Sequence, residues 1–137
     1  MLVEPYLFFD GRCEEAIDFY KKAIGAQVTS LMRFKENPEP SANPPGAAEK
    51  IMHASFRVGD TTIMASDGHE HFQGKPNFQG FALTIAVKTE AEAKKMFDAL
   101  ADGGRVQVPL GKTFFSPSFG MIFDRFGVMW MVIIPTM

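Results

Sequence analysis

The segment Ser66–Phe72 (SDGHEHF) holds two of the three histidines of this 137-residue chain, His69 and His71, with a glutamate between them. Imidazole nitrogens and carboxylates bind divalent metals, so the segment raises the question of a metal site. His53 could supply a third nitrogen, but a structural site needs a fourth ligand and an ordered surrounding shell. The triplet also lacks the i, i+4 spacing that puts two histidines on one helix face. The sequence therefore predicts a solvated loop without a bound metal, and metal binding by His69 and His71 is the alternative.

His53 lies in a segment, Lys50–Val58 (KIMHASFRV), that alternates as a β-strand does, with successive side chains on opposite faces. The apolar set, which should pack beneath a helix, is Met52, Ala54, Phe56 and Val58. The polar set, which should face a concave cleft, is His53, Ser55 and Arg57. Such a row could orient an oxygen-rich or anionic ligand, and His53 could act as a general base near neutral pH. The alternative is a solvated sheet face or a dimer contact.

Alternation along the fourth and the last predicted strands adds mostly apolar residues to this cleft. The predicted ligand-binding residues are His53, Ser55, Arg57, Met64, Ser66 and Met131. Met129 and Ile133 should line the same wall as Met131. His53 is the candidate catalytic residue.

The composition is that of a globular protein, with 46% hydrophobic and 22% charged residues. The net charge of −2 gives no reason to expect nucleic acid or an anionic membrane as a partner. We find no signal peptide and no apolar run of about 18 residues, so we expect a soluble cytoplasmic protein. The single cysteine, Cys13, allows no internal disulfide. Its place at the start of a helix would suit a reactive thiolate, but free cysteines are more often buried packing residues.

The hydrophobic pattern predicts one strand–helix–three-strand unit written twice, and hence the α+β class. Strands are predicted over 3–9, 27–34, 50–58, 61–66, 81–87, 105–110, 119–124 and 128–135, and helices over 12–24 and 89–101. Asp10 or Gly11 should lie near the first N-cap, Thr89 should cap the second helix with Glu92, and Asp124–Gly127 should form a turn. The proline-rich segment 35–49 should be a long loop or lid. We expect a single domain, 1–137, with modules 1–67 and 80–137 joined by a linker, 68–79.

With one helix for four strands, each module can cover only one face of its sheet. The other face must curl into a cleft or pair with another chain, so we expect a homodimer.

Four stretches resemble one known superfamily: "AIDFYKKAIGA", "PYLFFDGRCEEAIDFY", "IMHASFRVGDTTIMASD" and "FDRFGVMWMV". They are similar to the vicinal oxygen chelate superfamily of glyoxalases, bleomycin-resistance proteins and extradiol dioxygenases, and most of all to its PhnB-like, demethylubiquinone methyltransferase-like branch. The resemblance implies the glyoxalase/bleomycin resistance/dioxygenase fold, an incurved eight-stranded mixed sheet with helices on its convex face.

Enzymes of this superfamily hold a divalent metal with His or Glu from four strands. The resemblance places those positions at Pro5, Met64, Ala82 and Met131, of which the middle two carry an error of one or two residues. None of these side chains suits a hard divalent ion, so we expect no metal and no cofactor. An S-adenosylmethionine-dependent Rossmann methyltransferase is also not expected, because "FFDGRCEEA" has one glycine and the chain shows no repeated parallel units.

The function that the resemblance implies is that of a PhnB-like homodimer binding a small, largely apolar molecule in a metal-free cleft, as bleomycin-resistance proteins do. Its partners would be that molecule and a second copy of the chain. One alternative is a glyoxalase/dioxygenase-type lyase, isomerase or oxygenase that uses His53 or a non-standard divalent metal site. Another is a dimeric interaction module with a vestigial cleft. Whether modules pair within or across chains stays open.

Overall fold

The computed structural model describes residues 1–39, 43–68 and 76–136. His69 and His71, the two alternative metal ligands, lie outside these residues, as does most of the predicted linker. The chain divides into two compact units, residues 1–76 and 77–137. Among the described residues no helix has the length and apolar character needed to cross a membrane.

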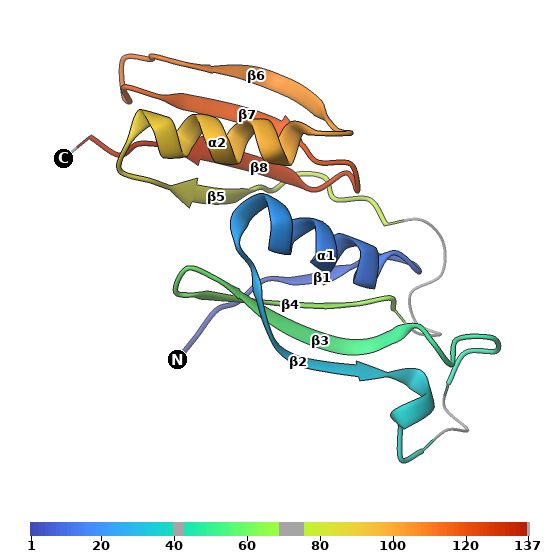
Figure 1. Cartoon of the computed structure of the whole chain (residues 1–137). Coiled ribbons are helices and arrows are strands. Elements are labelled where there is room, and N and C mark those ends of the chain that lie inside the picture. Colours follow the sequence, from blue (N-terminus) through green and yellow to red (C-terminus); the bar gives the residue numbers. More distant parts are fainter. Residues whose placement is uncertain (40–42, 69–75, 137) are drawn as a thin grey trace. The chain divides into compact units, whose positions relative to one another are not determined.

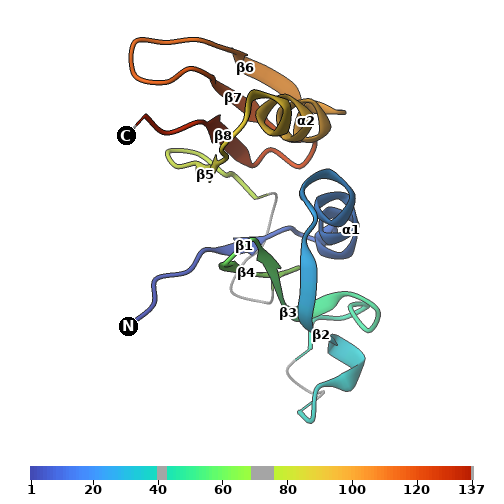
Figure 2. The same ribbon diagram turned by 60° about the vertical axis from the view of Figure 1, so that its left-hand side comes forward.

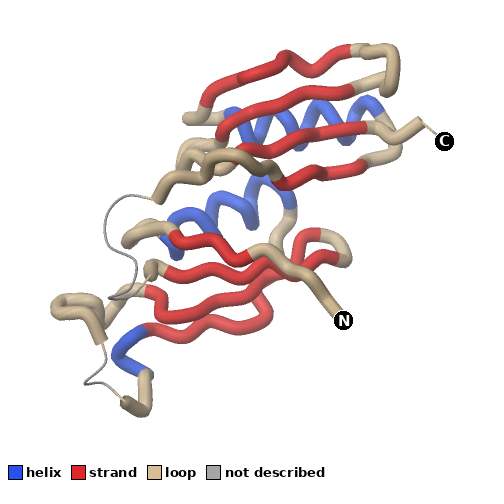
Figure 3. Tube along the Cα trace, turned by 180° about the vertical axis from the view of Figure 1, so that it is seen from behind, coloured by secondary structure: helices blue, strands red, loops and turns tan. Residues whose placement is uncertain are grey.

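The first unit is a mixed four-stranded sheet with one long helix against one face (Figures 1 and 3). Its strands follow the order β1-β4-β3-β2, with β1 parallel to β4 and the other neighbours antiparallel. Its elements are β1 (Tyr6–Phe8), α1 (Cys13–Ile24), β2 (Gln27–Arg33), the 3₁₀ helix η1 (Phe34–Glu36), β3 (Ile51–Val58) and β4 (Thr61–Ser66).

The second unit repeats this plan, with strand order β5-β8-β7-β6 and β5 parallel to β8. Its elements are β5 (Leu83–Ala86), α2 (Glu90–Ala101), β6 (Arg105–Gly111), β7 (Phe119–Phe123) and β8 (Met129–Ile133). The α+β class and the repeated βαβββ order are confirmed. Each unit forms its own four-stranded sheet. The strands β1, β5 and β8 are shorter than the sequence predicts.

Helix α1 has the buried stripe that its sequence spacing predicts. The buried residues are Cys13, Ala16, Ile17, Tyr20 and Ile24. The Tyr20 ring stacks on Phe56 of β3, with 5.9 Å between ring centroids, which joins the helix to the sheet. Gly25 ends the helix in the left-handed conformation at φ 70°.

The start of α1 is capped by a residue that is distant in the sequence. The N-cap residue is Arg12, whose side chain makes no cap hydrogen bond. The cap comes instead from Asp67, 54 residues along the chain, whose Oδ1 accepts from the Cys13 N–H at 2.8 Å. Asp10 and Gly11 lie just before the N-cap residue, near it as predicted, but the free N–H group is satisfied by a carboxylate directly after β4.

Helix α2 begins as predicted, with Thr89 Oγ1 accepting from the Glu92 N–H at 3.1 Å. Its buried residues are Ala93, Phe97 and Leu100. Phe97 packs so close to β7 that a Cβ on Gly120 would lie 2.6 Å from its ring.

The predicted turn at Asp124–Gly127 is confirmed. The Asp124 carboxylate accepts from the Phe126 and Val128 N–H groups and from Trp130 Nε1. These three hydrogen bonds stabilise the turn between β7 and β8.

In each unit the helix covers one sheet face, and no other described element of that unit lies against the opposite face, here called the open face (Figure 2). Residues on the helix side are buried: Leu7, Ala54, Phe56, Ile63 and Ala65 in the first sheet, and Ile122, Trp130 and Val132 in the second. On each strand, the residues that alternate with these buried residues point to the open face.

Candidate functional site

The polar row predicted on β3 lies on the open face of the first sheet. Ala54 and Phe56 are fully buried, whereas His53 and Ser55 are half-buried and Arg57 is exposed. The predicted alternation therefore holds from His53 to Arg57. The alternation breaks before His53, because a bulge in the β2–β3 pairing turns the Ile51 side chain to the buried face.

The register of the sheet places Tyr6 and Ser55 on either side of Met64. Tyr6 is paired with Met64 across the parallel β1–β4 ladder, and Ser55 is paired with Met64 across β3–β4. Tyr6, His53, Ser55 and Met64 thus share one open face, and all four are half-buried.

Tyr6 and His53 contact each other directly across this face. The Tyr6 Oη and His53 Nδ1 atoms are 3.1 Å apart, and the ring centroids are 5.6 Å apart. Phe8 extends the aromatic surface, with its ring centroid 4.8 Å from that of Tyr6. Either tautomer of the imidazole makes this bond, so His53 Nε2 can present a donor or an acceptor to a ligand.

The other predicted residues of the first sheet use their polar atoms within the protein. The Ser55 hydroxyl bonds with Thr29 Oγ1 at 2.9 Å, and Arg57 forms a 3.5 Å ion pair with Asp60. Ser66 is 1% exposed, and its Oγ accepts from the Gly68 N–H. Ser66 thus stabilises the end of β4. It is paired with Phe8 in the β1–β4 ladder, but its buried hydroxyl is not presented to a ligand.

Met131, the sixth predicted residue, lies in the second unit on the open face of β8. Its ladder partners are Thr84 on β5 and Met121 on β7. The Thr84 hydroxyl donates a weak hydrogen bond to Met131 Sδ at 3.8 Å.

The positions that the resemblance assigns to metal ligands hold no set of hard donors. The Pro5 carbonyl accepts from the Met64 N–H, and the side chain facing Met64 is that of Tyr6. Ala82 precedes β5, so the residue opposite Met131 is Thr84, two positions later than expected. Within residues 1–39, 43–68 and 76–136, no three His, Cys, Asp or Glu side chains converge on a point. These residues do not fit the divalent ion of the superfamily's enzymes.

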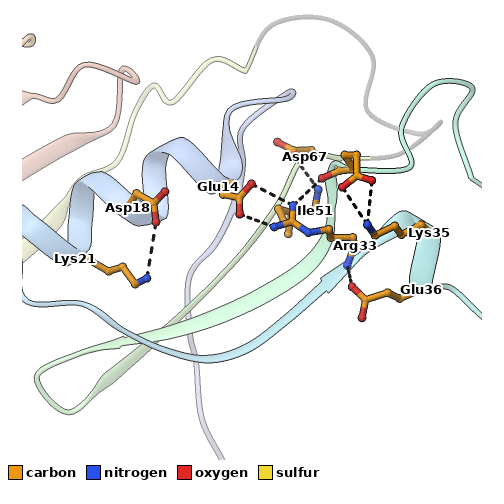
Figure 4. A network of polar contacts seen from close by, with 9 residues as sticks. Glu14, Asp18, Lys21, Arg33, Lys35, Glu36, Ile51 and Asp67 are labelled. Carbon is orange, nitrogen blue, oxygen red and sulfur yellow. Dashed lines mark hydrogen bonds and ion pairs between the residues drawn. The ribbon is translucent and has the colours of Figure 1, made fainter.

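A cleft of about 570 Å³ lies beside the N-terminal half of α1 (Figure 4). Asp67 lies in this cleft, with Oδ1 on the Cys13 N–H and Oδ2 on the Ile51 N–H, both at 2.8 Å. Arg33 of β2 binds Glu14 of α1 through two hydrogen bonds, and the bond from Arg33 holds the Glu14 pKa below its ordinary value. These contacts join α1 to β2, β3 and the end of β4, which is a structural role.

Cys13, whose N–H binds Asp67, is fully buried. Its burial, followed by the negative charges of Asp67 and Glu14, raises the pKa of the thiol well above its ordinary value. These features match the packing interpretation of Cys13 and oppose a thiolate nucleophile.

Sequence reasoning did not single out Tyr6 or Phe8, although both lie on the site face. The signal was present, because alternation along Tyr6–Phe8 with Leu7 buried puts both rings opposite the core. What no periodicity gives is the contact between Tyr6 and His53, because it depends on which strands are neighbours.

A family model described as 3-demethylubiquinone-9 3-methyltransferase matches residues 2–133. Protein PA1353 from Pseudomonas aeruginosa is 41% identical, with a TM-score of 0.88 and 98% of each chain covered. The PhnB protein from Bacillus cereus is 28% identical with a TM-score of 0.81, covering 98% of this chain and 99% of that one. Protein YjdN of Escherichia coli K12 is 34% identical over 96% of this chain and 94% of its own.

The fold extends to more distant proteins. The fosfomycin resistance protein FosX from Listeria monocytogenes has a TM-score of 0.66 at 9% identity, over 100% of this chain and 94% of that one, and this likeness concerns the fold alone. Because the family model spans nearly the whole chain, this protein belongs to the 3-demethylubiquinone-9 3-methyltransferase, or PhnB-like, family.

Proposed function

We propose that this protein binds a small, largely apolar molecule on the open face of its first sheet, as a homodimer and without a hard divalent metal. The observation that carries the proposal is the 3.1 Å contact between Tyr6 Oη and His53 Nδ1. This polar pair lies beside the ring of Phe8 and the side chain of Met64, so the face combines apolar surface with one polar point. Binding sites for small molecules have this composition.

The pair can hold an oxygen of the ligand through Tyr6 Oη and His53 Nε2. Since Tyr6 engages Nδ1, the ring of His53 is held in one orientation, with Nε2 left for a ligand. Phe8 and Met64 then supply apolar contact, and thioethers adapt to irregular ligand shapes. We therefore expect the ligand to carry a carbonyl, hydroxyl or anionic oxygen on an apolar body.

The donor atoms at these positions oppose a hard-metal role. Neither Pro5 nor Ala82 has a donor atom in its side chain, and the sulfurs of Met64 and Met131 are soft. The Listeria FosX structure was solved with Mn(II), which is a property of that protein.

The methyltransferase name of the family has no counterpart in the fold. Each module is a mixed sheet with a single parallel pair, β1–β4 or β5–β8. Doubly wound methyltransferases bind their cofactor at the carboxyl ends of parallel strands, after a glycine-rich turn. The proposal is accordingly one of binding and not of methyl transfer.

The proposed dimer is supported by apolar side chains that each module leaves exposed. Val106 on the edge strand β6 is 47% exposed, and Phe114, in the β6–β7 connection, is fully exposed. Large exposed apolar side chains at a sheet edge are typical of surfaces that pair with another chain. Light scattering after gel filtration should give twice the chain mass of 15.2 kDa, and a clean monomer would contradict the dimer.

The alternative function is an isomerase or lyase in which His53 is a general base. The same contact favours it, because a phenol that orients an imidazole is an arrangement in which the base is held for proton transfer. Turnover that needs His53 and an added divalent ion would favour this alternative over simple binding.

The binding proposal is tested with 8-anilinonaphthalene-1-sulfonate, a probe with an apolar aromatic body and an anionic oxygen group. Its fluorescence is titrated with the wild type, Tyr6→Phe, His53→Gln and the control Thr61→Ala, which alters an exposed residue at the other end of β4. We expect affinity to fall at least fivefold in the two site variants and to stay unchanged in the control and in excess EDTA. Equal affinity in all four proteins, with unchanged circular dichroism, would overturn the proposal.

A further inference from the structure

We propose that the open face of the second sheet holds a binding site for a soft monovalent cation, Cu(I) or Ag(I), built from the thioether sulfurs of Met121, Met129 and Met131. This site lies in the other module from the Tyr6–His53 pair, and the inference does not rest on the proposed function.

The register of the sheet brings the three methionines together. Met121 of β7 is directly opposite Met131 of β8, and Met129 lies two residues before Met131 on the same strand. Their sequence neighbours Trp130 and Ile122 are buried on the helix side, so all three methionines point to the open face, where each is half-buried. Opposed residues on one face have Cβ atoms about 5 Å apart. Unbranched thioether side chains on these positions can therefore meet above one point of the sheet.

The position of one sulfur is recorded directly. Met131 Sδ accepts a weak hydrogen bond from Thr84 Oγ1 at 3.8 Å, which shows that this sulfur lies at the open face and not in the core. The methionine side chain has three rotatable bonds and sulfur has two lone pairs. The Met131 side chain can therefore rotate away from Thr84 to bind a cation, or it can bind the cation with its second lone pair while the first still accepts from Thr84.

The donor set selects the ion. Thioether sulfur is neutral and soft and favours Cu(I) and similar ions over Mg²⁺, Mn²⁺ or Zn²⁺. The Arg105 guanidinium lies 4.6 Å from the ring centroid of Phe123, which is opposite Met129. A positive charge at that end of the face disfavours doubly charged ions more than a singly charged one.

Thioether ligation also has a distinctive pH signature. Methionine loses no proton on binding a metal, whereas imidazole and thiol ligands must be deprotonated. Cys13, the one thiol of the chain, is fully buried, so an added ion does not reach it in the folded protein. Binding at this site should therefore be as strong at pH 5 as at pH 7.

The test uses the full chain without a histidine tag and silver nitrate in chloride-free buffer at pH 5, where ordinary imidazoles are protonated. Calorimetry should give one Ag⁺ per chain. The double variant Met121→Leu/Met131→Leu, which conserves volume, should weaken binding at least tenfold, and Met129→Leu less. Met96→Leu on α2 is the matched control and should bind as the wild type does.

Cu(I) under anaerobic conditions, in competition with bathocuproine disulfonate, should repeat the same order among the variants. X-ray absorption of the Cu(I) complex should show sulfur neighbours. Three results would overturn the inference: no binding at pH 5, equal binding by the double variant when its circular dichroism matches the wild type, or nitrogen-only coordination.

Discussion

Replacing Asp67 should destabilise the first module far more than replacing any exposed carboxylate. Its two oxygens accept from the Cys13 and Ile51 N–H groups, each at 2.8 Å. Both donors belong to fully buried residues, so Asp67→Ala leaves two backbone N–H groups without their partner. We expect this substitution to separate the start of α1 from the end of β4.

The size of the loss follows from these two bonds. A hydrogen bond to a charged group contributes about 1.5–3 kcal/mol, and loss of an N-cap costs about 1 kcal/mol. Because Asp67 is half-buried and water can replace part of each bond, we expect Asp67→Ala to lower the free energy of unfolding by about 3 kcal/mol. Asp67→Asn keeps one acceptor oxygen and should lose about half as much.

Urea denaturation followed by far-ultraviolet circular dichroism measures this difference. With a slope of about 1.5 kcal/mol/M, Asp67→Ala should lower the midpoint by about 2 M. The control is Asp60→Ala, which removes an exposed carboxylate with a 3.5 Å ion pair to Arg57 and should change the midpoint little. Exposed surface substitutions typically change the free energy of unfolding by less than about 0.5 kcal/mol. If Asp67→Ala changes it by no more than this, the role assigned to Asp67 is wrong.

Three further predictions concern other contacts. The bond from Arg33 lowers the Glu14 pKa, so this pair should stabilise the fold above the ordinary carboxyl pKa and lose its effect as pH falls through the lowered value. The urea midpoints of Arg33→Gln and wild type should therefore differ most at pH 7, and the gap should narrow as Glu14 is protonated in acid. The bond from Arg33 to the Glu49 carbonyl does not depend on pH and leaves a smaller gap, so a gap that stays constant with pH would contradict this. Buried Cys13 should not react with Ellman's reagent at pH 8 until urea is added, and rapid reaction of the native protein would refute its burial. Gly104→Ala places a Cβ 2.1 Å from the Phe123 carbonyl oxygen and should lower the free energy of unfolding by about 3 kcal/mol. Gly111→Ala, which has open space at its Cβ, should lower it far less. Equal melting temperatures of the two variants would contradict the close approach at Gly104.

The repeated unit and most element bounds could be predicted because they depend on local pattern. The stripe on α1, the Thr89 cap and the turn at Asp124 each involve residues within a few positions of one another. The side chain that caps α1 could not be predicted, because the cap comes from Asp67, and nothing near Cys13 in sequence signals that partner.

In the candidate site, too, local features could be predicted and contacts between strands could not. Alternation correctly put His53, Ser55 and Arg57 on one face, but it could not show that the Ser66 hydroxyl is used by Gly68. Nor could it show the hydrogen bond between Tyr6 and His53, which joins residues 47 positions apart. Strand order, which local periodicity does not encode, decides such contacts.

The most direct measurement maps where a small apolar anion binds. Backbone amide spectra of the ¹⁵N-labelled protein, recorded during addition of 8-anilinonaphthalene-1-sulfonate, should shift first at Tyr6, Phe8, His53 and Met64. These residues form the open face of the first sheet. Shifts confined to other parts of the chain, such as the cleft around Glu14, would contradict a binding role for that face.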